Sequence, residues 1–425
     1  MNSPLEKRMD EERPRISWTE DGRRREARWL SVGRPAPPAR VVPADDTLDA
    51  DTAYRYACEG TAILWRGDFQ NGRQLLDAVA RRAGRSGRKA SWSPGQGSSP
   101  AETFHRLRMA RAQRAHILRM FVVEIESDYS IGLKRAPDAG RAILEALGHG
   151  HSRSVIPLRE VLGMISASEW RRKGVEVSAL GDRIHPHYGV FAPTRQEHVN
   201  LVAQAPLPAH TLAFDVGTGT GVLAAVLARR GVERIVCTDD EPRAVTCARE
   251  NMERLGLDER VEVLEADLFP PGGYPDRAPL VICNPPWIPA KPTTLLERAV
   301  YDPKGRMLRK FLKGLAGHLT PSGEGWLVLS DLAEHLGLRT REELLERVEA
   351  AGLQVLDRLD ARPTHAGLED PDDPLTKFRR METVSLWRLG PLPLHESGPK
   401  FRAMSAQWGD PAPRARGSAT KPSDL

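Results

Sequence analysis

The chain has 425 residues, of which 40% are hydrophobic and 28% are charged, and its formal net charge is +5. Such a length allows two or three domains with buried cores, and the absence of any run of about 18 apolar residues excludes a membrane-spanning helix. The N-terminus is charged throughout and lacks the apolar core of a secretory signal, and the four cysteines form no CxxC pair. We therefore expect a cytoplasmic protein without a zinc framework or a disulfide scaffold.

The first 180 residues predict a tail followed by a helical domain. Residues 1–50 are rich in Arg, Pro and Glu without sustained apolar periodicity, which is typical of a disordered tail. Residues 51–180 show apolar residues at helical spacing, which predicts a mainly helical domain with helices over 101–120, 141–148 and 158–174 and a strand over 121–126. A Gly, Ser, Pro and Lys-rich stretch at 84–100 predicts a flexible linker inside this domain.

From about residue 210, short apolar strands alternate with amphipathic helices. Strands are expected over 211–216, 234–239, 261–267, 279–284, 323–331, 353–360 and 382–389, and helices over 221–231, 241–256, 306–319 and 340–352. This rhythm predicts a doubly wound, mostly parallel α/β sheet of seven strands, a Rossmann-like domain over 181–390. Residues 391–425 are rich in Pro, Gly, Ser and Lys and are expected to be a disordered tail.

A glycine-rich loop follows the first of these strands. Asp215 precedes Gly217, Gly219 and Gly221 in a DxGxGxG pattern, whereas a dinucleotide fingerprint would need a glycine at position 222, which is Val. An acid at this place opposes a pyrophosphate but suits the cationic amino-acid part of S-adenosylmethionine. Ligands of such sheets bind at the carboxyl ends of the strands, so the loop is a candidate cofactor site. A purely structural turn is the alternative.

Two further acids end the next two strands. Asp239 ends the second strand, where an acid can hydrogen-bond both ribose hydroxyls, although Asp240 and Glu241 follow directly and leave the assignment open. Asp267 ends the third strand and could accept a hydrogen bond from an adenine amino group, with Leu268 supplying its backbone amide. Taken alone, each acid could equally be a solvent-exposed residue or a cap.

The fourth strand ends in Asn284-Pro285-Pro286-Trp287. Two consecutive prolines cannot donate to a strand ladder and force the chain out of the sheet. The Asn284 side-chain oxygen and the Pro285 carbonyl are two acceptors that could hold the two hydrogens of an NH₂ group, and Trp287 offers a flat surface for stacking. Such a nitrogen is a weak nucleophile, so holding it in line with a methyl-sulfonium bond is the catalysis required.

Together, these features resemble the class I S-adenosylmethionine-dependent methyltransferases whose fourth strand ends in (Asn/Asp)-Pro-Pro-aromatic. This subgroup includes DNA adenine, ribosomal RNA guanine and protein glutamine methyltransferases. The chain is most similar to the release-factor and ribosomal-protein glutamine methyltransferases with their small methyltransferase domain, over roughly 180–390. The segment 188–195 resembles the segment that lies over the cofactor in such domains, and it contributes Thr194 as a candidate.

The resemblance implies a role for each motif residue. The methionine part of S-adenosylmethionine would contact the glycine loop, the ribose would contact Asp239, and the adenine would contact Asp267 and Leu268. The substrate nitrogen would be received by the Asn-Pro-Pro-Trp motif. The complete set of implied residues is Asp215, Gly217, Gly219, Gly221, Asp239, Asp267, Leu268 and Thr194 for the cofactor, and Asn284, Pro285, Pro286 and Trp287 for catalysis.

The substrate is less defined than the reaction. Trp287 stands where Tyr or Phe is usual, and the first 180 residues match neither the short helical domain of the release-factor enzymes nor a second methyltransferase domain. The stretch from Arg66 to Arg119 contains 12 Lys or Arg residues and only three Asp or Glu residues, so this region could contact a nucleic acid.

We expect an N-methyltransferase of RNA, DNA or a translation protein. The alternatives are a small-molecule N-methyltransferase and a nucleic-acid-binding protein with a non-catalytic S-adenosylmethionine site. No metal is expected, because His185-Pro186-His187 has no further ligand cluster.

Overall fold

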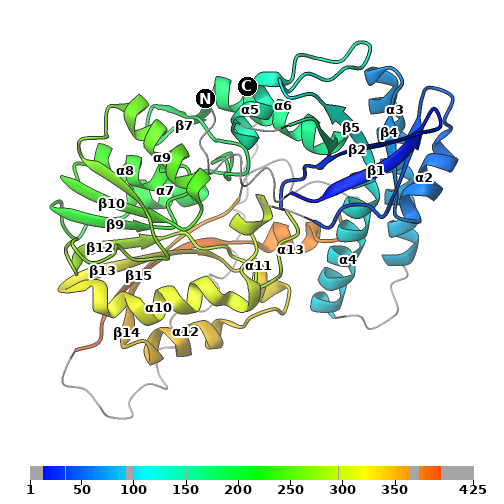
Figure 1. The fold of residues 1–425 in the computed structure, drawn as a ribbon. Coiled ribbons are helices and arrows are strands. Elements are labelled where there is room, and N and C mark those ends of the chain that lie inside the picture. Colours follow the sequence, from blue (N-terminus) through cyan, green and yellow to red (C-terminus); the bar gives the residue numbers. More distant parts are fainter. Residues whose placement is uncertain are drawn as a thin grey trace, which may run out of the picture.

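Two β-sheets organise the chain, one formed by its N-terminal part and one by its C-terminal half (Figure 1). The structure, a computed structural model, describes residues 13–33, 35–91, 99–149, 152–294, 296–363 and 373–393, with the backbone alone for 85–91. The tail expected after residue 390 lies almost entirely outside the described residues. Within them, no helix is long and apolar enough to cross a membrane.

The C-terminal sheet has seven strands, as the sequence predicts. In spatial order they are β11 (Val261–Glu265), β10 (Arg234–Asp239), β9 (Leu212–Val216), β12 (Ala278–Cys283), β13 (Leu319–Ser330), β15 (Val384–Pro391) and β14 (Leu353–Ala361). Neighbouring strands are parallel except that β15 runs antiparallel to both β13 and β14. The order reverses between β9 and β12, which is where sheets of this kind bind ligands.

Helices cover both faces of this sheet. On β12, Leu280 and Ile282 pack into one core cluster, while Val281 and Cys283 pack into another. This alternation is expected for a strand that is buried on both faces. The first cluster includes α7 (Glu197–Gln204), α8 (Val222–Arg229) and α9 (Pro242–Leu255), and the second includes α10 (Arg306–His318) and α12 (Arg341–Ala350). The predicted doubly wound fold is therefore confirmed.

The N-terminal part contains a six-stranded mixed sheet, which corrects the prediction of a disordered tail over 1–50. Its strands in spatial order are β1 (Arg15–Glu20), β2 (Arg23–Trp29), β6 (Ser154–Pro157), β5 (Phe121–Ile125), β4 (Thr61–Trp65) and β3 (Arg40–Ala44). The expected disordered tail over 1–50 is wrong for residues 15–44, because Ile16 and Trp18 alternate with exposed residues and are 4% exposed. Asp21 and Gly22, both with positive φ, form the hairpin turn between β1 and β2.

The region 51–180 is mainly helical, as expected, but it also contributes strands β4 and β6, which the sequence did not indicate. Its helices are α2 (Ala50–Cys58), α3 (Phe69–Ser91), α4 (Pro100–Arg119), α5 (Gly140–Leu147) and α6 (Leu158–Lys173), and they pack around the sheet. All five residues of β4 are buried, so this strand has no polar alternation that would distinguish it from a buried helix. A hairpin of β7 (Val175–Val177) and β8 (Asp182–Ile184) leads toward the second sheet.

The predicted linker over 84–100 is helical at both of its described ends. The backbone of α3 continues to Ser91, and α4 begins at Pro100 with a capping box between Ser99 and Glu102. Glycines at 84 and 87 each cost a helix only about 1 kcal/mol relative to alanine, which does not outweigh the packing of a long amphipathic helix. The part of the expected linker at 92–98 lies outside the described residues.

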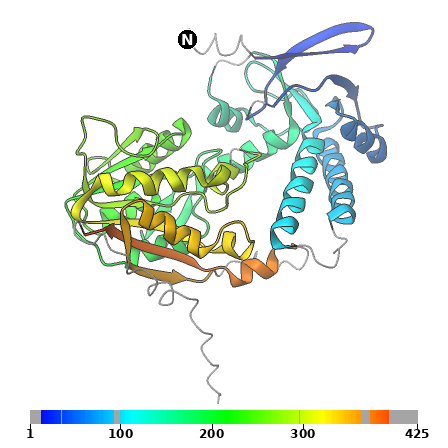
Figure 2. The ribbon, with the colours of Figure 1, turned by 90° about the horizontal axis from the view of Figure 1, so that it is seen from below.

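Helix α4 also packs against the C-terminal half. Figures 1 and 2 both show α4 beside α13 (Thr376–Met381). Phe104 of α4 is 1% exposed and forms a cluster with residues of the other half, which include Ile288, Tyr301 and Phe378, and Leu332 and Leu336 around α11 (Leu332–His335). The N-terminal part is thus packed directly against the segment that follows Trp287.

Candidate active site

The glycine loop directly follows β9. Gly217, Gly219 and Gly221 have φ values of 73°, 58° and 81°, which side-chain-bearing residues rarely adopt. The amides of Gly217 and Thr218 donate to the carbonyl of Thr238 on β10 at 2.8 and 2.9 Å. The loop is therefore fixed against the neighbouring strand before Gly221 begins α8.

Asp215 lies beneath this loop. Its side chain is 1% exposed, and its Oδ2 accepts a hydrogen bond from the Thr218 hydroxyl at 2.6 Å. Burial raises the pKa of Asp215 to about 6, because the charged form loses its solvation. Asp215 supports the loop through this hydrogen bond, and its predicted contact with the cofactor stays a prediction.

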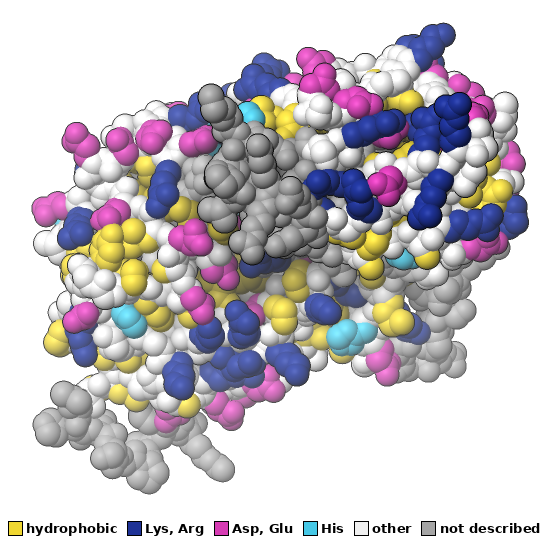
Figure 3. All heavy atoms as spheres, in the orientation of Figure 1, with side chains coloured by type: hydrophobic (Ala, Val, Ile, Leu, Met, Phe, Trp, Pro, Cys, Tyr) yellow, Lys and Arg dark blue, Asp and Glu magenta, His cyan; other side chains and the backbone are white. Residues whose placement is uncertain are grey.

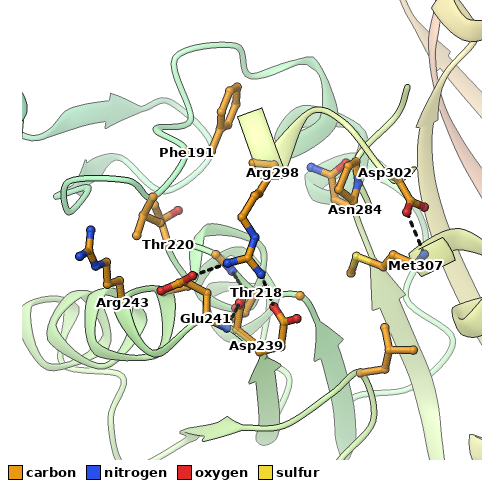
Figure 4. A pocket seen from close by; sticks show the side chains of 18 of the residues that line it. Phe191, Thr218, Thr220, Asp239, Glu241, Arg243, Asn284, Arg298, Asp302 and Met307 are labelled. Carbon is orange, nitrogen blue, oxygen red and sulfur yellow. Dashed lines mark hydrogen bonds and ion pairs between the residues drawn. The ribbon is translucent and has the colours of Figure 1, made fainter. Parts of the chain in front are cut away.

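Asp239 ends β10 and is held by two backbone hydrogen bonds. Its Oδ2 accepts from the Gly219 amide at 2.9 Å and its Oδ1 from the Glu241 amide at 3.0 Å. Burial raises the pKa of Asp239, and these hydrogen bonds oppose that rise. The neighbouring Asp240 and Glu241 instead pair with Arg298, at 3.7 and 2.6 Å, and Figure 4 shows the pair between Glu241 and Arg298. Of the three acids, Asp239 is therefore the one fixed against the glycine loop.

A cavity of about 430 Å³ opens at the carboxyl ends of β9, β10 and β12. Its volume lies in the range of roughly 300–1,000 Å³ that is usual for small-molecule sites. The predicted residues that line it are Gly217, Gly219, Asp239, Asp267, Leu268, Asn284 and Pro286. The predicted residues that are not part of its lining are Asp215, Gly221, Pro285, Trp287 and Thr194. The cofactor and acceptor motifs thus meet in one cavity.

Asp267 and Leu268 reach this cavity just after β11. Asp267 pairs with Lys310 of α10, whose Nζ lies 2.7 Å from Oδ2. Leu268 has a φ of 77°, and its carbonyl accepts a hydrogen bond from the Thr238 hydroxyl. The backbone here is therefore held in an unusual turn against β10, and Lys310 is a partner that the sequence did not reveal.

Asn284 lines the cavity, and Trp287 holds its side chain. Trp287 Nε1 donates to Asn284 Oδ1 at 2.8 Å. The indole packs against buried hydrophobic clusters, and the Arg195 guanidinium carbon lies 5.6 Å from the centre of the ring. The indole orients Asn284 and is only partly buried, and its predicted stacking on the substrate stays a prediction.

Several lining residues escaped the sequence analysis. The pre-strand segment contributes Phe191 and Pro193 to the cavity, whereas Thr194 is exposed and lies outside the lining. Further lining residues are His198, Arg298, Tyr301 and Met307. No spacing pattern marks His198, since a single histidine beside apolar helix positions is usually a core residue.

Arg108 of α4 holds the loop between Ile288 and Asp302, which includes the 3-10 helix η1 (Leu296–Ala299). Its guanidinium donates to both oxygens of Glu297, at 2.7 and 3.1 Å, and to the Lys291 carbonyl at 2.8 Å. Its carbon atom also lies 3.9 Å from the centre of the Tyr301 ring. Because Arg298 and Tyr301 line the cavity, the N-terminal part fixes one wall of it.

Cationic side chains gather beside the cavity on α10 and the preceding η2 (Pro303–Gly305), where Figure 3 shows a group of Lys and Arg. The exposed members are Lys304, Arg306, Arg309, Lys310 and Lys313. By contrast, the basic stretch 66–119 is partly neutralised within the chain. Arg66 pairs with Glu20 and Glu124, and Arg82 pairs with Asp51.

In the part of the chain that the structure describes, no three His, Cys, Asp or Glu side chains gather as a metal site would need. Residues 183–352 match the family model of the methyltransferase small domain. This part of the chain is therefore an S-adenosylmethionine-dependent methyltransferase domain.

Relatives of this methyltransferase include enzymes that modify translation proteins. The chain is 28% identical over 283 residues to the release factor glutamine methyltransferase of Cereibacter sphaeroides, an alignment that covers 60% of this chain and 96% of the relative. It is 34% identical over 146 residues to the ribosomal protein L11 methyltransferase of Pelotomaculum thermopropionicum, which covers 34% of this chain but only 39% of that relative. A solved L11 methylase from Lactobacillus delbrueckii subsp. bulgaricus is 17% identical, with a TM-score of 0.34, covering 50% of this chain and 88% of that one.

The residues of the cavity fit S-adenosylmethionine. A Cβ added at Gly219 would meet no atom within 4 Å, so the loop leaves open space for a ligand at this point. Asp239 and the buried Asp215 supply negative charge, which favours a cation, while Leu268 and Val222 add apolar surface. This combination suits a sulfonium-bearing nucleoside.

Proposed function

We propose that this enzyme methylates the side-chain amide nitrogen of a glutamine in a translation protein. The observation that supports this most is the position of Asn284. It lines the same cavity as the glycine loop, Asp239 and Asp267. An acceptor nitrogen bound at Asn284 would therefore share an enclosed space with a methyl donor bound at the glycine loop.

The cofactor would be held mainly by backbone and acid groups. We assign the methionine part to the loop of Gly217 and Gly219, the ribose to Asp239, and the adenine to Asp267 and Leu268. When bound, S-adenosylmethionine would supply an electrophilic methyl group; its transfer would leave the C–S electron pair on sulfur and release one N–H proton of the acceptor to solvent. The chain contributes orientation, since proximity and alignment can lower such a barrier substantially.

The acceptor amide would be held by two oxygens. Trp287 occupies one acceptor position of Asn284 Oδ1, and a carbonyl oxygen retains a second lone pair. That lone pair and the Pro285 carbonyl would accept the two N–H bonds of the amide. Holding both hydrogens fixes the nitrogen and favours the positive charge that develops on it during transfer.

The choice of a protein glutamine is supported by the relatives. The alignment with a release factor glutamine methyltransferase extends over 96% of that enzyme's length, and the L11 methyltransferase is likewise named for a protein of the translation apparatus. The exposed cations at the start of α10 favour an acidic or phosphate-bearing surface near the target amide, such as a ribosomal particle.

The proposal is tested by methyl transfer from radiolabelled S-adenosylmethionine to purified release factors, ribosomal proteins and RNA from the source cells. We expect label in a protein, with mass spectrometry placing one methyl group on a glutamine. Asn284→Ala should lose transfer while retaining cofactor affinity by calorimetry. Label in RNA or in small molecules alone, or full activity of Asn284→Ala, would contradict the proposal.

A further inference from the structure

We propose that His198 hydrogen-bonds the carbonyl oxygen of the acceptor amide and thereby selects a primary carboxamide over other amines. This inference rests on the proposed function, because it concerns the group held at Asn284. His198 lies in the first turn of α7, and its side chain lines the cavity. The family resemblance assigned no role to this position.

His198 is buried without a hydrogen-bond partner in the part of the chain that the structure describes. The residue is 6% exposed, and its Nδ1 is buried with no partner. Polar side chains that are buried in native proteins are nearly always hydrogen-bonded. Because the His198 side chain lines the cavity, a ligand that reaches the ring would give it a hydrogen-bond partner.

His198 and Asn284 are linked through Trp287. The imidazole and indole rings meet edge to face, with centroids 6.5 Å apart and an interplanar angle of 81°. The same indole donates to Asn284 Oδ1 at 2.8 Å. Trp287 therefore supports both side chains from behind, and His198 belongs to the acceptor end of the cavity.

The charge state of His198 suits an uncharged substrate. Burial lowers the pKa of His198 to about 4, and the nearby Arg195 lowers it too, while Glu197 opposes them. At neutral pH the ring therefore carries one N–H donor and one acceptor. A neutral donor can bind an amide oxygen without repelling a sulfonium cation in the same cavity, as a protonated histidine would.

A primary carboxamide matches Asn284 and His198, which line the cavity, together with the carbonyl of Pro285, which is outside the cavity lining. Its two N–H bonds would face the Asn284 oxygen and the Pro285 carbonyl, and its carbonyl oxygen would accept from the imidazole. An amine with no adjacent acceptor would leave the imidazole unpaired, and sites built to bond a polar group reject analogues that lack it. In this arrangement His198 is a positioning residue, because it orients the amide and transfers no proton.

The test compares His198→Gln, His198→Phe and His198→Ala in steady-state methyl transfer to a purified release factor, with cofactor affinity measured by calorimetry. Phe retains the edge contact with Trp287 but cannot donate, whereas the Gln amide can. We expect kcat/KM to fall about 10- to 100-fold in the Phe and Ala variants, as when one buried hydrogen-bonding partner is removed, and Gln to recover about tenfold over Phe. The Kd for S-adenosylmethionine should stay within about twofold of wild type, because a contact made only with the acceptor does not bind the cofactor.

The outcomes separate the two proposals. If His198→Phe is as active as wild type, or Gln is no better than Phe, the histidine only fills space and this inference falls, while an inactive Asn284→Ala would still support the proposed function. If Asn284→Ala keeps full activity, or the wild-type enzyme labels no glutamine in release factors or ribosomal proteins, the proposed function falls and the carboxamide inference falls with it.

Discussion

Trp287 Nε1 lies 2.8 Å from Asn284 Oδ1, and this hydrogen bond determines which way the Asn284 amide faces. An indole N–H can only donate, so the atom that it meets must be the oxygen. The amide group is thereby prevented from flipping. The remaining lone pair of that oxygen is available for an acceptor nitrogen, which is the arrangement that N-methylation of an amide needs.

Trp287→Phe should slow the methyl-transfer step with little change in cofactor affinity. Phenylalanine retains most of the packing but loses the hydrogen bond, whose net value is about 1 kcal/mol, or roughly a fivefold to tenfold change in rate. Single-turnover kinetics with saturating S-adenosylmethionine measure this step directly. Unchanged single-turnover rates would mean that Asn284 needs no support from the indole.

Cofactor binding should weaken as the pH falls through about 6. Burial raises the pKa of Asp215 to about 6, so this carboxylate begins to take up a proton in mildly acidic solution, and burial also raises the pKa of Asp239. A sulfonium cation favours the charged carboxylates, so binding should release protons below about pH 7 and gain about tenfold in affinity for each unit by which it lowers a pKa. Titration calorimetry in buffers of different ionisation enthalpy measures both quantities.

Two controls define this pH effect. S-adenosylhomocysteine lacks the sulfonium charge and should show a smaller pH dependence than S-adenosylmethionine. Asp215→Asn should reduce the dependence and leave only the part due to Asp239. Equal pH profiles for the two ligands would contradict the electrostatic explanation.

Arg108→Ala should weaken cofactor binding even though Arg108 belongs to the N-terminal part of the chain. Arg108 donates to both oxygens of Glu297 and stacks on Tyr301, so its loss frees the loop that contributes Arg298 to the cavity. We expect a stability loss of about 1–2 kcal/mol in urea denaturation, because the pair is bidentate and is supplemented by the ring contact. The Kd for S-adenosylmethionine should rise several-fold.

The matched control for this variant lies on the same helix. Arg111 approaches Asp373 at 3.6 Å, and its own side chain is 43% exposed, so Arg111→Ala should change stability by less than about 1 kcal/mol and leave the Kd unchanged. If both variants weaken cofactor binding equally, the effect comes from the general charge of α4 and not from the contacts of Arg108 with the loop.

Gly217→Ala should impair both folding stability and cofactor affinity. The new Cβ would lie 2.6 Å from Met307 Cε, and the backbone φ of 73° is strained for any other residue by about 1–2 kcal/mol. Gly256→Ala provides the comparison, since Gly256 has a φ of 64° but its Cβ would meet no atom within 4 Å. Only the Gly217 variant should lose affinity for S-adenosylmethionine, and parallel losses in both would trace the effect to backbone strain alone.

The C-terminal half was predictable because its local patterns agree with its tertiary structure. Strands such as Arg234–Asp239 have apolar runs with clear boundaries, and the glycine and proline motifs mark where they end. The N-terminal sheet was missed because its signals are weaker. Strand Arg23–Trp29 is mostly arginine, and only Ala27 and Trp29 are buried along it. The alternation of buried and exposed residues along this strand depends on only two apolar side chains, and the charged residues around them hide it in the sequence.

The position of the site could be predicted from the sequence, but the contacts between its side chains could not. The order of motifs along the chain fixed which strand ends would meet, and seven of the predicted residues line one cavity. The partners of Trp287, Arg108 and His198 could not be predicted, because each contact joins residues that the fold alone brings together. Arg108 and Glu297, for example, are 189 positions apart.

Phe104 has a consequence for the integrity of the whole molecule. It is buried among side chains that belong almost entirely to the other half of the chain, next to the segment that follows the acceptor motif. Severing the polypeptide near residue 180 would leave Ile288, Tyr301 and Phe378 facing water without that aromatic cover. The C-terminal half would then expose an apolar surface beside its cavity. We therefore expect such a truncated protein to self-associate and to lose activity.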